Sequence, residues 1–152
     1  MSTKESKEPS SPLRAVLDTN VLISAAIRPE GQAGHIWDLA RERRFQMLTS
    51  PQIVNELCEK LRTKFFWDDK RLGLFLRRLR RPAEIIVTTT RLSVVPDDPD
   101  DNAIIECAVD GKADIIVSGD NDLLRMKRYE AIPILHPNDF LHTLGGVKTK
   151  NL

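Results

Sequence analysis

Acidic side chains stand at four points of this chain where a strand should end or a helix should begin. They are Asp18, Glu56, Asp101, and the pair Asp120 and Asp122. Carboxylates that meet in space repel one another, so such a cluster persists mainly when a cation neutralises it. Oxygen-only ligands suit the hard ions Mg²⁺ and Mn²⁺. The first chemistry to test is therefore metal-dependent phosphoester chemistry.

The sequence offers little support for other catalytic chemistries. His35, His136 and His142 lie far apart and share no ligand spacing, and no Cys/His zinc motif is present. There is no glycine-rich phosphate loop in a strand–loop–helix context. A Gly-x-Ser-x-Gly elbow is also absent, which argues against acyl transfer by serine.

The elements that must position these acids alternate between extended and helical patterns. We expect strands at residues 14–17, 45–49, 84–87, 92–95, 114–118 and 132–135. We expect helices at 19–26, 32–44, 51–61, 69–79, 99–111, 120–124 and 138–144. Pro133 would place the last strand toward an edge of the sheet, because proline lacks the backbone donor.

Strands that alternate with helices predict a parallel sheet covered by helices on both faces. In open sheets of this kind, ligands bind beyond the carboxyl ends of the strands. Asp18 directly follows one expected strand, and Asp120 lies two residues beyond another. Asp101 falls in the first turn of a helix that follows a third extended segment. Topology therefore predicts that these acids meet at one edge of the sheet.

Each acid also has an ordinary structural explanation. Asp98 is a natural helix N-cap before a proline, and Asp101 would interact favourably with the dipole of the same helix. Asp120 could cap the next helix, and Asp18 could simply end a strand. Periodicity alone gives little reason to assign Glu56 a functional role, since this residue only flanks the apolar face of its helix. The set is more persuasive than its members, because capping does not require each strand to end in an acid.

Size and composition indicate an ordinary globular protein. The 152 residues suit one domain, and 41% are hydrophobic and 30% charged. No apolar run approaches the roughly 20 residues of a membrane helix. Cys58 and Cys107 fall inside expected helices, which disfavours a disulfide framework and makes the cytoplasm the default compartment. We expect residues 1–12 to be a disordered leader and 145–152 a flexible tail.

Opposite charges are concentrated in two segments. Residues 60–81 hold nine Lys or Arg against two Asp, whereas residues 94–122 hold nine Asp or Glu against one Lys. One part of the molecule could thus grip a polyanion while another collects cations. The alternative, that both segments are solvated helix faces, stays open.

Four motifs in this order resemble those of the PIN-domain family. They are the run from Val16 to Leu22, a glutamate in the helix opened by Ser50-Pro51, the run from Asp98 to Asn102, and the run from Val117 to Leu124. The resemblance covers residues 13–144 and points to the PIN-type toxins of prokaryotic toxin–antitoxin modules. It implies a three-layer α/β/α sandwich around a parallel sheet, related to the core of flap endonucleases.

The resemblance also implies an activity: a ribonuclease that cleaves single-stranded RNA with Mg²⁺ or Mn²⁺. The family's catalytic and metal-binding positions match Asp18, Glu56, Asp101 and Asp120, with Asp122 as a fifth ligand, and its supporting positions match Thr19, Asn20, Asn102 and Ser118. The basic segment would attract the RNA backbone through Lys60, Arg62, Lys64, Arg77 and Arg78. A homodimer, a cognate antitoxin as protein partner, and a cytoplasmic location without membrane attachment are also implied.

Some choices remain open at the level of sequence. Asp101 is selected over Asp100 because it matches the family and precedes Asn102, which leaves Asp98 as the helix cap. A shifted register would select Asp100 instead. A phosphatase or receiver-like domain also places acids at strand ends, but the phosphatase motif Asp-x-Asp-x-Thr fails because position 20 is Asn. A catalytically silent module that binds RNA or a protein partner is the third interpretation.

Overall fold

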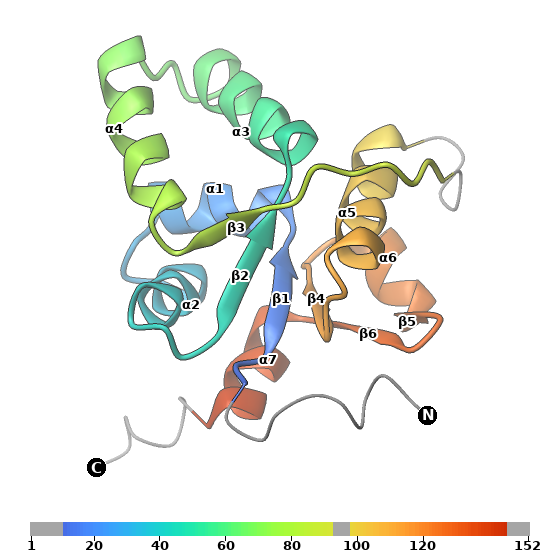
Figure 1. Cartoon of the computed structure of the whole chain (residues 1–152). Helices are drawn as coiled ribbons and strands as arrows, with labels where there is room; N and C mark the ends of the chain where they lie inside the picture. The colour runs from blue at the N-terminus through green and yellow to red at the C-terminus, as the bar shows by residue number, and fades with distance from the viewer. Residues whose placement is uncertain (1–10, 93–97, 146–152) are drawn as a thin grey trace.

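The computed structural model describes residues 11–92 and 98–145 (Figure 1). Its strands are β1 (Arg14–Leu17), β2 (Gln46–Thr49), β3 (Ala83–Ile85), β4 (Ile115–Val117), β5 (Arg128–Tyr129) and β6 (Ile132–Leu135). Its helices are α1 (Thr19–Ile27), α2 (Gln32–Arg41), α3 (Pro51–Thr63), α4 (Asp69–Arg80), α5 (Pro99–Asp110), α6 (Asn121–Met126) and α7 (Pro137–Leu144). Most of the expected leader and tail, and most of the extended segment at 92–95, lie outside the described residues.

The strands form one sheet in the order β3-β2-β1-β4-β6-β5. All neighbouring pairs are parallel except β5 and β6, which are antiparallel. The strand that contains Pro133, β6, lies second from one end of the sheet, between β4 and the two-residue strand β5. The strand tolerates the proline because the pairing with β4 begins one residue later, at Ile134.

Helices cover both faces of this sheet, which confirms the expected three-layer α/β/α architecture (Figure 1). Helix α5 packs over β1, β2 and β4, while α1, α2 and α7 pack together on the other face. The central strands are almost entirely buried, as parallel strands between two helical layers should be. Within the described ranges, every helix is too short or too polar to cross a lipid bilayer.

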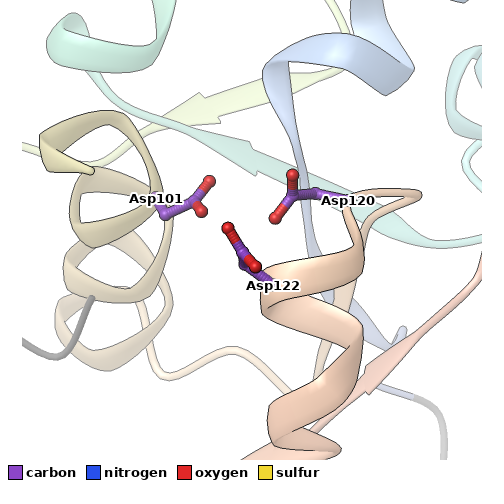
Figure 2. Close-up of side chains that lie close together, drawn as sticks. All are labelled: Asp101, Asp120 and Asp122. Carbon is purple, nitrogen blue, oxygen red and sulfur yellow. The ribbon is translucent and has the colours of Figure 1, made fainter. Parts of the chain in front are cut away.

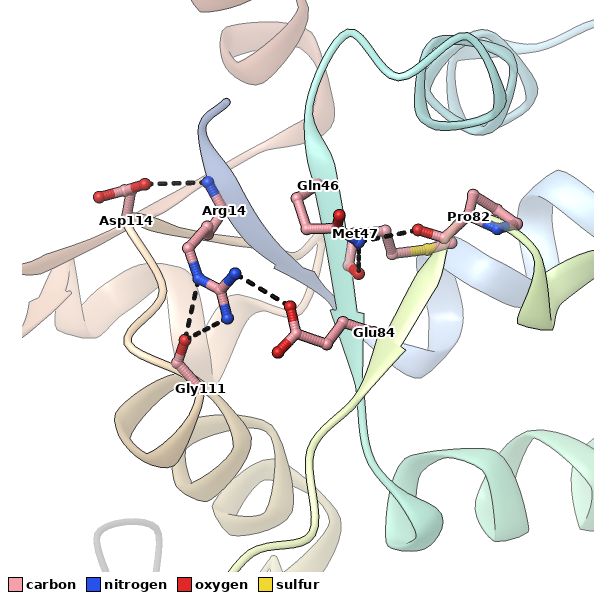
Figure 3. Close-up of polar contacts among 7 residues, drawn as sticks. All are labelled: Arg14, Gln46, Met47, Pro82, Glu84, Gly111 and Asp114. Atoms are coloured by element: carbon pink, nitrogen blue, oxygen red, sulfur yellow. Dashed lines mark hydrogen bonds and ion pairs between the residues drawn. The ribbon is translucent and has the colours of Figure 1, made fainter. Parts of the chain in front are cut away.

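Arg14 fastens the edge of the sheet where the strands begin (Figure 3). Its guanidinium donates to the carbonyl oxygen of Gly111 at 2.8 and 3.1 Å and pairs with Glu84 at 2.9 Å. Its backbone N–H donates to Asp114 Oδ2 at 2.9 Å. These contacts tie β1 to the end of α5 and to β3. They hold the strands together at the ends where the strands begin. The acids lie at the opposite ends, where the strands finish.

Side-chain caps define where two of the helices near these opposite ends of the strands begin. Ser50 accepts a hydrogen bond from the backbone N–H of Ile53, with Pro51 at the first helical position. Asp98 accepts one from the N–H of Asp101 at 3.2 Å, ahead of Pro99. The expected caps at Ser50 and Asp98 are therefore present. Glu56 and Asp101 consequently fall in the early turns of α3 and α5.

Candidate metal centre

Ser118 joins the ends of the two central strands. Its Oγ donates to Asp18 Oδ2 at 2.6 Å and accepts from the backbone N–H of Asp120 at 2.9 Å. The N–H of Asp18 donates to the carbonyl of Val117 at 2.9 Å, so the pairing of β1 with β4 continues into the site. Parallel pairing thus brings Asp18 and Asp120 to the same edge of the sheet, although they lie far apart in sequence.

Three carboxylates converge in front of this edge (Figure 2). Asp101 projects from α5, Asp120 precedes α6, and Asp122 lies in the first turn of α6. One oxygen from each lies within 4.8 Å of the other two. Asp101 is only 6% exposed, and its Oδ2 has no hydrogen-bond partner among residues 11–92 and 98–145. A buried carboxylate with an unpartnered oxygen, close to two further carboxylates, is an arrangement that a bound cation would stabilise.

Electrostatic crowding is strongest at Asp101. Burial, and then the charges of Asp120, Asp98 and Asp18, raise its pKa to about 8. Burial also raises the pKa of Asp18, and the charges of Glu56 and Asp120 add to the effect. The hydrogen bond from Ser118 acts in the opposite direction. The chain alone therefore leaves Asp101 and Asp18 short of positive charge, whereas Asp122 pairs with Arg125 at 3.0 Å.

Glu56 lies beside the same site but is better compensated. One of its oxygens accepts from Thr19 Oγ1 at 2.6 Å, and the other pairs with Lys60 Nζ at 2.8 Å. Asp100 shares a further hydrogen bond with it. Burial alone would raise the pKa of Glu56, but the hydrogen bonds from Lys60, Thr19 and Asp100 bring it below its ordinary value. Burial and the hydrogen bond to Glu56 raise the pKa of Asp100 to about 6, so Asp100 takes up a proton before Glu56 as the pH falls.

The structure brings all five predicted acids to the carboxyl edge of the sheet. Asp101 lies close to Asp120, while the neighbouring Asp100 hydrogen-bonds with Glu56. The sequence left Asp100 open as the alternative to Asp101, and the structure places both residues near the other acids. Among the predicted supporting residues, Thr19 and Ser118 contact the acids directly, Asn20 donates its backbone N–H to Asp18, and Asn102 is buried in α5.

The predicted RNA-binding residues fall in separate places. Lys60 lies in the acidic site, Arg62 pairs with Asp69 at 3.0 Å, and Lys64 is exposed at the end of α3. Arg77 and Arg78 instead line a pocket of about 950 Å³ between α2 and α4, together with Arg41, Arg43 and Arg81. Because the pocket includes Pro82, just before β3, it lies at the edge of the sheet where the strands begin. The basic segment 60–81 is therefore divided: Lys60 lies where the strands end, whereas Arg77 and Arg78 lie where the strands begin.

A smaller pocket of about 550 Å³ adjoins the acids. Asn20, Gly119 and Asp120 form its side toward the metal-site candidates, and Arg28 and His136 are among its other lining residues. A polar pocket of this size beside a cation site could receive part of a nucleotide.

Ser118→Ala tests how far the acidic site depends on this hydroxyl. The substitution removes the donor to Asp18 and the acceptor for the N–H of Asp120 while adding no bulk. We expect the free energy of unfolding at neutral pH to fall by about 1–3 kcal/mol, because two buried polar groups lose their partner. Urea denaturation measures it. Ser24→Ala, at an exposed position on α1, is the matched control, and an equal effect of both substitutions would contradict the assigned role.

Comparisons with known proteins agree with this geometry. The family model described as PIN domain matches residues 14–122. The uncharacterized protein MJ1680 of Methanocaldococcus jannaschii is 36% identical over 142 residues, which cover 85% of this chain and 90% of that protein. Among solved structures, VapBC2 from Rickettsia felis, bound to a DNA fragment from its promoter, aligns with a TM-score of 0.61. That alignment covers 82% of this chain and 98% of the other at 14% identity, so it speaks to the fold alone.

Proposed function

This chain belongs to the PIN-domain family, and we propose that it is a metal-dependent endoribonuclease that cleaves single-stranded RNA. The observation that carries the proposal is the buried Asp101 carboxylate, which has an oxygen unpartnered within the described residues and lies close to Asp120 and Asp122. Structural capping accounts for Asp98 and Asp120, but it gives no reason to bury an uncompensated carboxylate at Asp101. A divalent ion supplies that reason.

The donor set fits Mg²⁺ or Mn²⁺, because it consists of carboxylate oxygens without thiolate or imidazole. Asp101, Asp120 and Asp122 would hold the ion, with Asp18 close behind Asp120. When bound, such an ion lowers the pKa of an attacking water and neutralises charge on the scissile phosphate. The metal therefore accounts for both the electrostatics of the site and the proposed reaction.

The chain's own residues supply orientation. Ser118 fixes Asp18 and the backbone at Asp120, and Thr19 fixes Glu56, so three acids are held by hydrogen bonds from neighbouring elements. Preorganised charge of this kind costs no rearrangement when charge develops on the phosphate. The pocket that contains Asn20 and Arg28 would bind the nucleotide next to the cleaved bond.

Metal removal tests the proposal directly. Purified protein should cleave an unstructured, labelled RNA in the presence of Mn²⁺ or Mg²⁺, lose the activity in EDTA, and regain it when either ion is returned in excess. Product lengths on a denaturing gel distinguish internal cleavage from removal of terminal nucleotides. Full activity in EDTA would contradict a metal-dependent reaction and would favour a contaminating ribonuclease. Metal binding without cleavage of any RNA would favour the catalytically silent module.

Arg77 and Arg78 test whether RNA also contacts the pocket between α2 and α4. Neither guanidinium forms an ion pair within the described part of the chain, so both are available to phosphates. The double substitution Arg77→Ala/Arg78→Ala should flatten the plot of log affinity against log salt by about 1.4, since each contact to a single strand contributes about 0.7. Filter binding at several salt concentrations measures this slope. Arg62→Ala is the control, because Asp69 already engages that guanidinium, and an unchanged slope in the double variant would remove this pocket from the RNA path.

We further propose that the protein is the cytoplasmic toxin of a toxin–antitoxin module, forms a homodimer and is blocked by a cognate antitoxin. Support comes from the family and from the fold shared with VapBC2. Phe66, Leu74 and Val87 are large apolar side chains exposed in the single chain, and contacts with a partner would cover such groups. Light scattering of the purified chain tests the dimer. Growth arrest on expression, relieved by the co-expressed partner, tests the toxin role.

A further inference from the structure

Lys60 is a cation that the fold brings into the acidic site. It lies one helical turn after Glu56 on α3, and its ammonium nitrogen is 2.8 Å from Glu56 Oε2. The Lys60 side chain is only 26% exposed and the Glu56 side chain only 12%. Exposed ion pairs of this spacing on a helix are common and weak, but this pair is largely withdrawn from solvent. Its position within the site therefore calls for an explanation beyond the helix itself.

The carboxylates around it fall into two groups. Asp101, Asp120 and Asp122 face one another, whereas Glu56 and Asp100 share a hydrogen bond. Asp18 lies close to both groups, since the charges of Glu56 and Asp120 both act on it. In the first group, Asp101 keeps an unpartnered buried oxygen, and Asp122 forms an exposed ion pair with Arg125 at 3.0 Å. The second group contains an ammonium that is largely withdrawn from solvent.

We propose that the Lys60 ammonium occupies the second cation position of this site, so that the chain binds a single divalent ion, in the Asp101, Asp120 and Asp122 group. This inference rests on the proposed metal-dependent function. Two-metal phosphoesterase sites place their ions about 3.5–4 Å apart and surround both with carboxylates. Here Lys60 pairs with Glu56 in the second group, and its positive charge repels a second divalent ion. The site is thus a one-metal centre with a fixed organic cation beside it.

The number of Mn²⁺ ions bound per chain tests this inference without reference to catalysis. The full chain, freed of metal, is titrated with Mn²⁺, and the free ion is followed by electron paramagnetic resonance. The wild type should bind one equivalent. Lys60→Met removes the charge but keeps an unbranched apolar side chain, and it should bind a second equivalent. Lys60→Gln provides the same test should the methionine variant fold poorly, and circular dichroism confirms the fold of each.

Two matched variants locate the added ion. Lys64→Met removes an exposed lysine just after the end of α3, and the number of bound ions should remain one. Glu56→Gln/Lys60→Met removes the acid that would hold the second ion, and it should return the count to one while the first site stays intact. Together these variants separate a local effect at Glu56 from a general change in net charge.

Each outcome decides a different statement. No Mn²⁺ bound by the folded wild type would overturn the proposed metal-dependent function and this inference with it. Two equivalents in the wild type, or one equivalent in both folded Lys60 variants, would overturn only the role of Lys60. A second equivalent in Lys64→Met as well would show that net charge, rather than the position of Lys60, sets the number of ions.

Discussion

Asp101→Asn should abolish metal-dependent cleavage and at the same time stabilise the metal-free protein. Asparagine keeps the shape of the side chain but removes the charge that Asp120, Asp98 and Asp18 oppose. Because the pKa of Asp101 is raised to about 8 from 3.8, the folded state holds a proton that the unfolded chain releases. Its stabilising contribution is complete below about pH 4 and is lost as the pH rises through about 8. The variant has no titratable group at position 101, so its free energy of unfolding does not decrease in this way as the pH rises.

The advantage of the variant should therefore grow with pH. In EDTA we expect its free energy of unfolding, relative to that of the wild type, to rise on the order of 2–4 kcal/mol between about pH 5 and about pH 8. Urea denaturation at both pH values measures this difference. Excess Mn²⁺ should reverse the order, since an ion at about 100 times its dissociation constant stabilises the wild type by about 2.7 kcal/mol. A variant that is less stable than the wild type in EDTA at the higher pH would contradict the crowded site.

Part of this site could be predicted from sequence because it follows from topology. An apolar run directly before Asp18 and another shortly before Asp120 predict two buried parallel strands, and such strands end at the same edge. The cap at Asp98 could be predicted for a similar reason, since a cap and a following proline are local signals. Local sequence patterns and sheet topology therefore suffice to predict that Asp18, Asp101 and Asp120 lie at the same end of the sheet.

The contacts between helices could not be predicted in the same way. Glu56 meets Asp100 because α3 packs against α5, and no periodicity within either helix specifies that approach. The spacing of Lys60 from Glu56 predicts an ion pair on α3, but not that the pair enters the acidic site. Helix packing depends on the tertiary fit of side chains, so these residues acquire their roles only in the folded chain.

The division of the basic segment has the same origin. Residues 60–81 are continuous in sequence, but α3 begins beside the acids and α4 ends near the start of β3. Helix α4 is anchored there because Phe75 stacks on Trp37 of α2, with ring centroids 5.3 Å apart. Arg77 and Arg78 are thereby carried to the far edge of the sheet. A charge run read along the chain cannot reveal such a separation.

Asp18→Asn should reduce RNA cleavage by about a thousandfold or more while leaving the fold intact. Asp18 is 5% exposed and lies close to both groups of carboxylates, so its charge acts on both Glu56 and Asp120. Loss of that charge weakens the hold on the divalent ion, and the several kcal/mol that a catalytic metal supplies correspond to roughly this factor in rate. Asparagine still offers an oxygen to the Ser118 hydroxyl, so the strand ends should remain joined. Initial rates on a labelled, unstructured RNA, at a Mn²⁺ concentration that just saturates the wild type, measure the loss.

The comparison with Ser118→Ala distinguishes charge from position at this residue. In Ser118→Ala the Asp18 carboxylate remains but loses its donor at 2.6 Å, so activity should fall less than in Asp18→Asn while stability falls more. Asp139→Asn removes an exposed carboxylate on α7 and should match the wild type in both measurements. If Asp18→Asn retained a tenth or more of the activity in a clean preparation, the cleaving centre would not be this edge of the sheet. If Asp18→Asn lost activity only because it no longer folded, the role of Asp18 would be structural. The loss of activity would then give no evidence that its negative charge takes part in cleavage.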